Sequence, residues 1–219
     1  MSKKFAVILS GCGYLDGAEI REAVLTLLAL DSANANYDIF APNENQFHTI
    51  NHMEMSEEKE QRNILLESAR IARGKVIDLN QLNTNDYAGL LIPGGFGVAK
   101  NLCTFAFDGA SAKATAKVTE VITNFNDQQK PIGAICIAPA LISLVLGHKG
   151  IEVTIGTDES TASEIEKTGA KHFNCERDEY HLDQKNKIAT TPAYMFDETK
   201  LNLVMKGISA VVENVIKWS

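Results

Sequence analysis

The strongest constraint on the fold is the alternation of short β-rich segments with amphipathic helical segments along the chain. Phe5–Leu9 and Ala88–Ile92 are almost continuously apolar, as expected for strands of a parallel sheet that is covered on both faces. Residues 118–125 instead carry apolar side chains at helical spacing, with Val118 and Phe125 at its two ends. This alternation predicts an α/β protein, a three-layer sandwich with a mostly parallel central sheet.

The other segments follow the same alternation. Residues 42–60 interrupt it with a long polar excursion, but no linker or repeat divides the chain, so we expect one domain over residues 1–219. A final helix is expected to begin after Asp197 as its N-cap. The remaining expected elements are strands at Tyr37–Phe40, Val76–Leu79, Pro131–Ile135, Glu152–Ile155, Lys171–Phe173 and Lys187–Thr190, and helices at 19–30, 63–71, 138–145 and 160–168.

Composition excludes several classes of partner. Twenty-one Lys and Arg residues face 28 Asp and Glu residues, which gives a formal charge of −7. Nucleic acids and anionic membranes require a concentrated basic face, so neither is expected as a partner. The four cysteines form no CxxC pair, and the glycine loops lack the GxGxxG dinucleotide fingerprint. We therefore expect a cytoplasmic protein with reduced thiols, no metal and no cofactor.

The most informative stretch places a cysteine between a strand and a helix. Pro131–Ile135 reads as a buried strand, Cys136 follows directly, and Pro139 suits the first turn of the next helix. This order is typical of a nucleophile elbow, in which a sharp turn exposes the side chain at the carboxyl edge of the sheet. The helix N-terminus there favours a thiolate. The simpler alternative is a small buried apolar residue.

Glycines that follow the central strand could bind an oxyanion. Gly94 and Gly95 come directly after Ala88–Ile92, and glycine lets backbone N–H groups approach a ligand closely. Together with the N–H of Ile137, they could form an oxyanion hole beside Cys136. The alternative is an ordinary turn that ends a strand.

A catalytic thiol needs an acid or base partner, and two glutamates are candidates. Glu19 and Glu22 lie at the start of the first helix, at the same edge of the sheet, and their spacing puts them on roughly one side of that helix. Either could instead be a solvated residue favoured by the helix dipole. His181 is a weaker candidate for a Cys–His dyad. His48 and His52 have metal-ligand spacing but lack a third ligand, so the sequence favours no metal site.

Several segments together carry a resemblance to a known family: Ser10–Gly13, Asp16–Leu25, Arg62–Asn63, Ser68–Gly74, Ile92–Leu102, Ile135–Pro139 and Thr190–Met195. They strongly resemble the ElbB family, glyoxalase-like proteins once linked to isoprenoid biosynthesis. This family belongs to the PfpI and class I glutamine amidotransferase-like superfamily, and the resemblance covers nearly the whole chain.

The resemblance implies a flavodoxin-like fold with the nucleophile at Cys136 and a glutamate that hydrogen-bonds its sulfur. Glu22 matches the family's register better than Glu19, which stays as the alternate. The resemblance also implies a homodimer. Cys136 is followed by Ile137, and no His-x-Glu pair follows downstream, in contrast to true amidotransferases and PfpI-type proteases.

The leading functional hypothesis is a cofactor-independent glyoxalase that converts small α-oxoaldehydes, glyoxal to glycolate for example. Cys136 would form a hemithioacetal, Glu22 would act as acid and base, and the N–H groups of Gly95 and Ile137 would hold the oxyanion. One alternative is a non-enzymatic oxidation sensor that uses the same thiol. Another is a glutaminase-like subunit, which would require a histidine beside Cys136.

Overall fold

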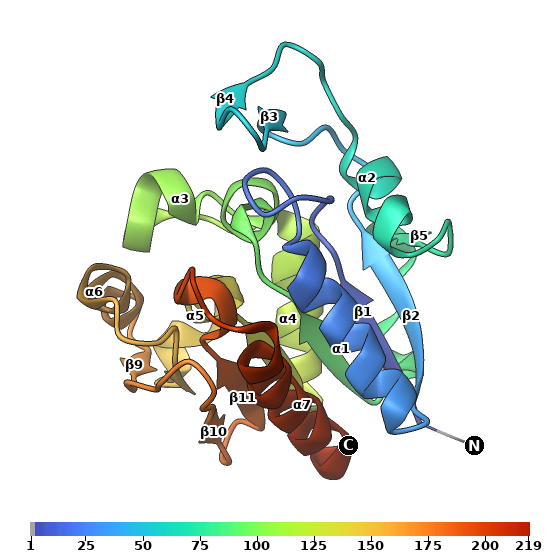
Figure 1. The fold of residues 1–219 in the computed structure, drawn as a ribbon. Coiled ribbons are helices and arrows are strands. Elements are labelled where there is room, and N and C mark those ends of the chain that lie inside the picture. The colour runs from blue at the N-terminus through green and yellow to red at the C-terminus, as the bar shows by residue number, and fades with distance from the viewer. Residues whose placement is uncertain (1–2) are drawn as a thin grey trace.

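A seven-stranded sheet forms the centre of the molecule (Figure 1). The structure is a computed structural model that describes residues 3–219. The sheet order is β10-β11-β7-β6-β1-β2-β5, and all pairs are parallel except β10 with β11. Its strands are β1 Lys4–Ile8, β2 Asn36–Ala41, β5 Ile77–Asp78, β6 Gly89–Ile92, β7 Ile132–Ile135, β10 His181–Asp183 and β11 Ile188–Thr191. The order β2-β1-β6-β7-β11 is the flavodoxin-like order, with one short strand added at each edge.

Helices cover both faces of this sheet, which confirms the predicted three-layer α/β fold (Figure 1). Alternate side chains of β1 explain the apolar run, because Ala6 and Ile8 enter one core while Val7 enters the other. No helix within residues 3–219 is both long and apolar enough to cross a bilayer. Helices α1 and α7 pack on one face of the sheet, and α4 and α5 pack on the other. The helices are α1 Ile20–Ser32, α2 Ile64–Ile71, α3 Phe105–Asp108, α4 Ala116–Asp127, α5 Ala138–Leu146, α6 Glu159–Lys167 and α7 Leu201–Trp218.

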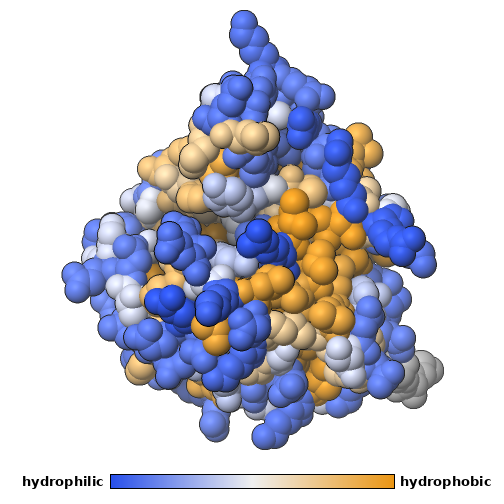
Figure 2. Space-filling view, viewed as in Figure 1, coloured by the Kyte–Doolittle hydropathy of each residue, from blue (hydrophilic) through white to orange (hydrophobic). Residues whose placement is uncertain are grey.

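One face of α1 stays apolar and exposed. Ile20, Val24 and Leu28 recur every four residues and are 45%, 47% and 47% exposed. Figure 2 shows hydrophobic surface gathered where α1 lies in Figure 1. We refer to these three residues as the α1 face. Its opposite side carries Glu22, which is fully buried.

The excursion at residues 42–60 folds over the carboxyl edge of the sheet. It contains a small hairpin of β3 Ile50–Asn51 and β4 Ser56–Glu57, seen at the top of Figure 1. The Ile50 N–H donates to Asp16 Oδ2 at 2.7 Å, so the hairpin is attached to the loop after β1. The excursion is therefore a folded part of this edge.

Three details differ from the sequence-based expectations. Asp197 is not the N-cap of α7; Lys200 holds that position, because residues 196–199 first form a turn in which the Thr199 N–H donates to Phe196 O. The expected strands near residues 152 and 171 form a separate two-stranded sheet, β8 Glu152–Val153 with β9 Lys171–His172. The edge strand β10 was not predicted, since three residues are too few for a periodic signal.

The strand order determines where a site can form. From β1 the chain moves outward to β2 and β5, and it then returns to the other side of β1 as β6. Ligands of open α/β sheets bind at such a switch point, outside the carboxyl ends of the strands. The loops after β1, β6 and β7 all meet at this edge.

Candidate active site

Cys136 occupies a strained turn between β7 and α5. Only Cys136 and Ile137 separate the last residue of β7 from the first residue of α5. Cys136 has a φ of +61°, a left-handed conformation that costs a non-glycine residue about 1–3 kcal/mol. Its N–H donates to Thr191 O at 2.9 Å, and the residue is 7% exposed. The predicted elbow geometry is therefore present at this position.

Glu22 lies against the Cys136 thiol from the first turn of α1. Its side chain is fully buried, and both carboxyl oxygens accept backbone N–H groups. Gly94 donates to Oε2 at 3.0 Å, and Tyr194 donates to Oε1 at 3.1 Å. The carboxyl group also hydrogen-bonds the Cys136 sulfur. A buried thiol and a buried carboxyl group thus share one small site.

Glu19 has a different position from Glu22. It is the N-cap of α1, and its Oε2 accepts the N–H of Glu22 at 2.6 Å. Burial raises the pKa of Glu19, while hydrogen bonds from backbone N–H groups oppose this effect. The structure therefore places Glu22 beside the sulfur and Glu19 at the end of the helix.

The glycine loop divides its N–H groups between the two reactive side chains. The N–H groups of Gly95 and Ile137 hydrogen-bond the Cys136 sulfur, whereas the N–H of Gly94 is used by Glu22. A Cβ atom added to Gly94 would lie 2.4 Å from Cys136 Cβ and 2.6 Å from Glu22 Oε2. Of the three predicted oxyanion donors, two point at the sulfur, and the third holds the carboxyl group.

Burial determines the electrostatics of the pair. Desolvation, and then the charge of Glu19, raise the pKa of Glu22 to about 8, against the opposing effect of its hydrogen-bond donors. Desolvation and the charge of Glu22 raise the pKa of Cys136 well above its ordinary value, although the Gly95 and Ile137 N–H groups act in the other direction. The expectation of a thiol whose pKa is lowered by the helix N-terminus is therefore wrong, because a thiolate loses more by leaving water here than it gains from two N–H groups.

The predicted histidine candidates lie elsewhere. His181 contacts Glu152 at 3.3 Å and stacks on Phe173 with ring centroids 4.2 Å apart. His52 accepts the Leu15 N–H through Nε2. Within residues 3–219, no histidine hydrogen-bonds Cys136, and no group of three His, Cys, Asp or Glu side chains could hold a metal ion.

Two residues that help to build the site, Tyr194 and Asn101, were not predicted from the sequence. Tyr194 acts through its backbone N–H, which has no residue-specific signature; the available signal was the family resemblance of Thr190–Met195, a segment that begins at the end of β11. Asn101 lies in a π-helical turn, Val98–Leu102, and its Nδ2 donates to Ser10 O and Asp16 O. Its Oδ1 accepts the Phe47 N–H at 2.9 Å, so one side chain joins three segments around the site.

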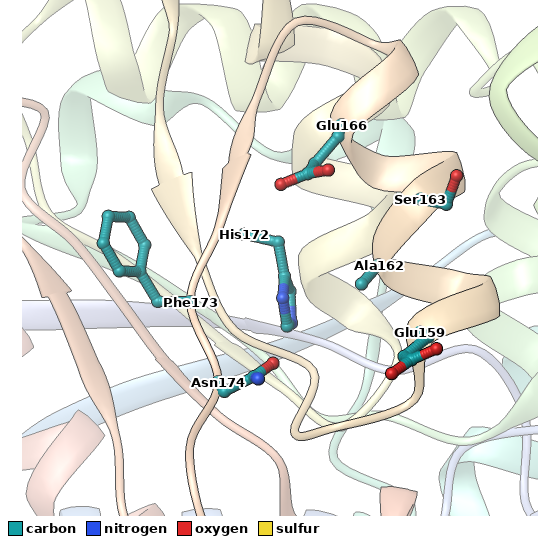
Figure 3. A pocket seen from close by; sticks show the side chains of 7 residues that line it. All are labelled: Glu159, Ala162, Ser163, Glu166, His172, Phe173 and Asn174. Carbon is teal, nitrogen blue, oxygen red and sulfur yellow. The ribbon is translucent and has the colours of Figure 1, made fainter.

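A cavity lies away from this pair, between α6 and β9 (Figure 3). Glu159, Glu166 and His172 point into it in Figure 3. The Nε2 atom of His172 accepts the Ile155 N–H at 3.2 Å, so this histidine connects backbone segments. None of the residues that line this cavity contacts Cys136 or Glu22.

Comparison with known proteins identifies clear relatives. No family model matches the chain. The chain is 45% identical to the rat "ES1 protein homolog, mitochondrial", over 98% of this chain and 83% of that protein. It is 46% identical to the human "Glutamine amidotransferase-like class 1 domain-containing protein 3, mitochondrial", over 98% of this chain and 82% of that protein.

The names of these relatives contradict the expectation of a cytoplasmic protein. The rat and human proteins, and a zebrafish ES1 protein that is 34% identical, are all called mitochondrial. The prediction failed because it relied on free cysteines. Reduced thiols argue only against an oxidising compartment and cannot distinguish between reducing ones.

Solved structures agree with these relationships. The crystal structure of an isoprenoid biosynthesis protein with an amidotransferase-like domain from Ehrlichia chaffeensis is 39% identical, with a TM-score of 0.91 over 99% of both chains. Drosophila melanogaster DJ-1beta shares the fold, with a TM-score of 0.61 at 15% identity over 100% of this chain and 96% of that one. Fold, identity and coverage lead to one conclusion: the chain belongs to the family of ES1 and glutamine amidotransferase-like class 1 domain proteins.

Proposed function

We propose that the protein is a cofactor-independent glyoxalase that converts glyoxal, or another small α-oxoaldehyde, to the corresponding 2-hydroxy acid. The observation that carries the proposal is the buried contact between the Cys136 thiol and the Glu22 carboxyl group. A nucleophile supplies a covalent site for the aldehyde, and a carboxyl group with a pKa of about 8 can both take and return a proton near neutral pH.

The first step adds the thiol to one aldehyde carbon. The sulfur forms a bond to that carbon, and the thiol proton goes to the aldehyde oxygen, which gives a hemithioacetal. The Gly95 and Ile137 N–H groups already lie at the sulfur and would be next to the developing oxyanion. The raised pKa of Cys136 means that the thiol must lose its proton as it attacks, rather than beforehand.

The second step moves hydrogen between the two carbons. The Glu22 carboxylate removes the proton from the carbon bonded to sulfur, which gives an enediol, and returns a proton to the neighbouring carbon. The product is a thioester of glycolate, and water hydrolyses it to glycolate and the free thiol. Glu22 must be ionised for this step, so the rate should rise with pH through about 8.

Glycolate formation from glyoxal tests the proposal directly. We expect Cys136→Ala to abolish turnover and Glu22→Gln to lower it by about 10²–10⁴-fold. Cys175→Ala is the matched control, because Cys175 is 8% exposed, close to the 7% of Cys136, and lies outside the site. Circular dichroism would verify folding. Equal conversion by wild type and Cys136→Ala would refute the covalent mechanism.

A second candidate function is a cysteine-based oxidation sensor. Three donors around one sulfur, the Gly95 and Ile137 N–H groups and a protonated Glu22, would also hold a sulfinate. Peroxide titration separates the two functions. A sensor consumes about two equivalents per Cys136 and stops, whereas a glyoxalase turns over with its thiol reduced. A glutaminase-like subunit is less well supported, since it would require a histidine partner for Cys136.

We further propose that the chain is of the ElbB type, a single domain over residues 1–219, and a homodimer. The Ehrlichia chaffeensis relative supports the first two points, since it is named an isoprenoid biosynthesis protein and the match covers 99% of both chains. The exposed α1 face supports the third, because a contiguous apolar patch is typical of an interaction surface.

A further inference from the structure

One short segment contacts both members of the reactive pair. Thr191, the last residue of β11, accepts the Cys136 N–H at 2.9 Å. Three residues later, the Tyr194 N–H donates to Glu22 Oε1 at 3.1 Å. The turn between them, residues 191–194, therefore fixes the backbone of the nucleophile at one end and the carboxyl group at the other.

This turn depends on a strained residue. Ala193 has a φ of +45° and is fully buried. An alanine in the left-handed region is uncommon, and such residues persist where the surrounding structure forces them. Changing φ at Ala193 would rotate the peptide that follows, and with it the Tyr194 N–H. The unusual conformation is therefore what points this N–H at Glu22.

The side chain of Tyr194 holds the same turn from outside. Its hydroxyl oxygen accepts a hydrogen bond from Arg21 Nη1 at 3.1 Å, and the guanidinium lies 5.7 Å from the ring centroid. Arg21 directly precedes Glu22 on α1. Tyr194 is thus attached to α1 twice, through its backbone to Glu22 and through its hydroxyl to Arg21.

We propose that Ala193 and Tyr194 are positioning residues for Glu22. The left-handed Ala193 and the contact between Tyr194 and Arg21 together hold the Tyr194 N–H on Oε1, while Gly94 holds Oε2, so that the carboxyl group stays against the Cys136 sulfur. The catalytic importance of this arrangement rests on the proposed function; the positioning itself does not.

The physical consequence can be measured on Glu22 alone. A backbone N–H that donates to a carboxylate favours its charged form, so the Tyr194 N–H lowers the pKa of Glu22 against the effect of burial. Complete loss of one hydrogen bond to a charged group would raise the pKa by about one to two units. Loosening the turn should therefore give an upward shift of at least about half a unit.

The experiment is a ¹³C NMR titration of the full-length protein labelled at the glutamate carboxyl carbon. The Glu22 resonance is the one that Glu22→Gln removes. The test variants are Tyr194→Phe, which removes only the hydroxyl contact with Arg21, and Ala193→Gly, since glycine leaves the left-handed conformation without strain and frees the turn. Tyr37→Phe is the matched control, because the Tyr37 hydroxyl hydrogen-bonds Asp31, a charged residue at the far end of α1.

We expect a Glu22 midpoint near pH 8 in wild type and in Tyr37→Phe, and a higher midpoint in both test variants. A midpoint unchanged from wild type in folded Tyr194→Phe or folded Ala193→Gly would overturn the role of the residue concerned. An equal shift in Tyr37→Phe would mean that the effect is not specific to this turn. The titration needs no substrate, so its result is informative even if neither wild type nor any variant forms glycolate.

Discussion

The buried carboxyl group of Glu22 should make the stability of the protein depend on pH in a characteristic direction. Its pKa is about 8 in the folded state and 4.5 in the ordinary, solvated state. Between these values the folded protein keeps a proton that the unfolded chain releases, so stability falls as pH rises. The difference between these two pKa values corresponds to about 5 kcal/mol of stability, which is present below pH 4.5 and lost by about pH 8.

Urea unfolding of wild type and Glu22→Gln at several pH values between 5 and 8 measures this effect. Glutamine does not titrate, so the difference in the free energy of unfolding, wild type minus variant, should fall by about 3–4 kcal/mol over this range. That corresponds to a relative shift in the urea midpoint of the order of 1–2 M. The variant has its own constant cost, because the glutamine amide must place N–H groups against the Gly94 or Tyr194 donor.

The slope of this difference is what tests the reasoning, since a constant cost cancels. Glu120→Gln is the matched control, because it removes a carboxylate that is exposed on α4. A difference between wild type and Glu22→Gln that stays flat from pH 5 to 8 would refute the claim that burial penalises the charged form of Glu22.

Three further predictions concern the same helix and loop. Gly94→Ala should lose turnover by at least about 10²-fold, because the added methyl group would overlap Cys136 Cβ, Glu22 Oε2 and the Ile135 carbonyl oxygen and force the thiol and the carboxyl group apart; retained activity in the folded variant would show that their contact is dispensable. Glu19→Gln removes a negative charge that raises the pKa of Glu22, so the pH–rate midpoint should move down with turnover retained; abolished turnover would instead assign the acid–base role to Glu19. On the α1 face, the double substitution Val24→Glu with Leu28→Glu should convert a dimer to monomers in light scattering, and an unchanged mass would place the interface elsewhere.

The parts of the site that could be predicted from sequence are the local ones. The elbow at Cys136 could be predicted because the strand, the cysteine and the helix are adjacent in the chain, so the local pattern alone sets the turn. The choice of Glu22 over Glu19 needed the family resemblance, since both residues have similar helical positions. Pattern alone could not decide which oxygen receives which N–H group.

The parts that could not be predicted depend on burial by distant segments. The raised pKa of Cys136 reflects exclusion of water by the loop at Gly94 and by Glu22, which lie far away in sequence. The contribution of Tyr194 is a backbone N–H, which every residue but proline has. For α7, the Asp197 signal suited an N-cap, but the tertiary turn before the helix moved its start to Leu201.

Asn101 has a consequence for how this region can vary between relatives. One amide side chain satisfies backbone groups of the loop after β1 and of the excursion, at Ser10, Asp16 and Phe47. Lifting the excursion as a whole would break the hydrogen bond between the Phe47 N–H and the buried Asn101 amide, so we expect motion there to hinge beyond this attachment. Insertions and deletions should accordingly collect at the hairpin tip around residues 52–55, whereas the chain length between Phe47 and Ile50 should be fixed.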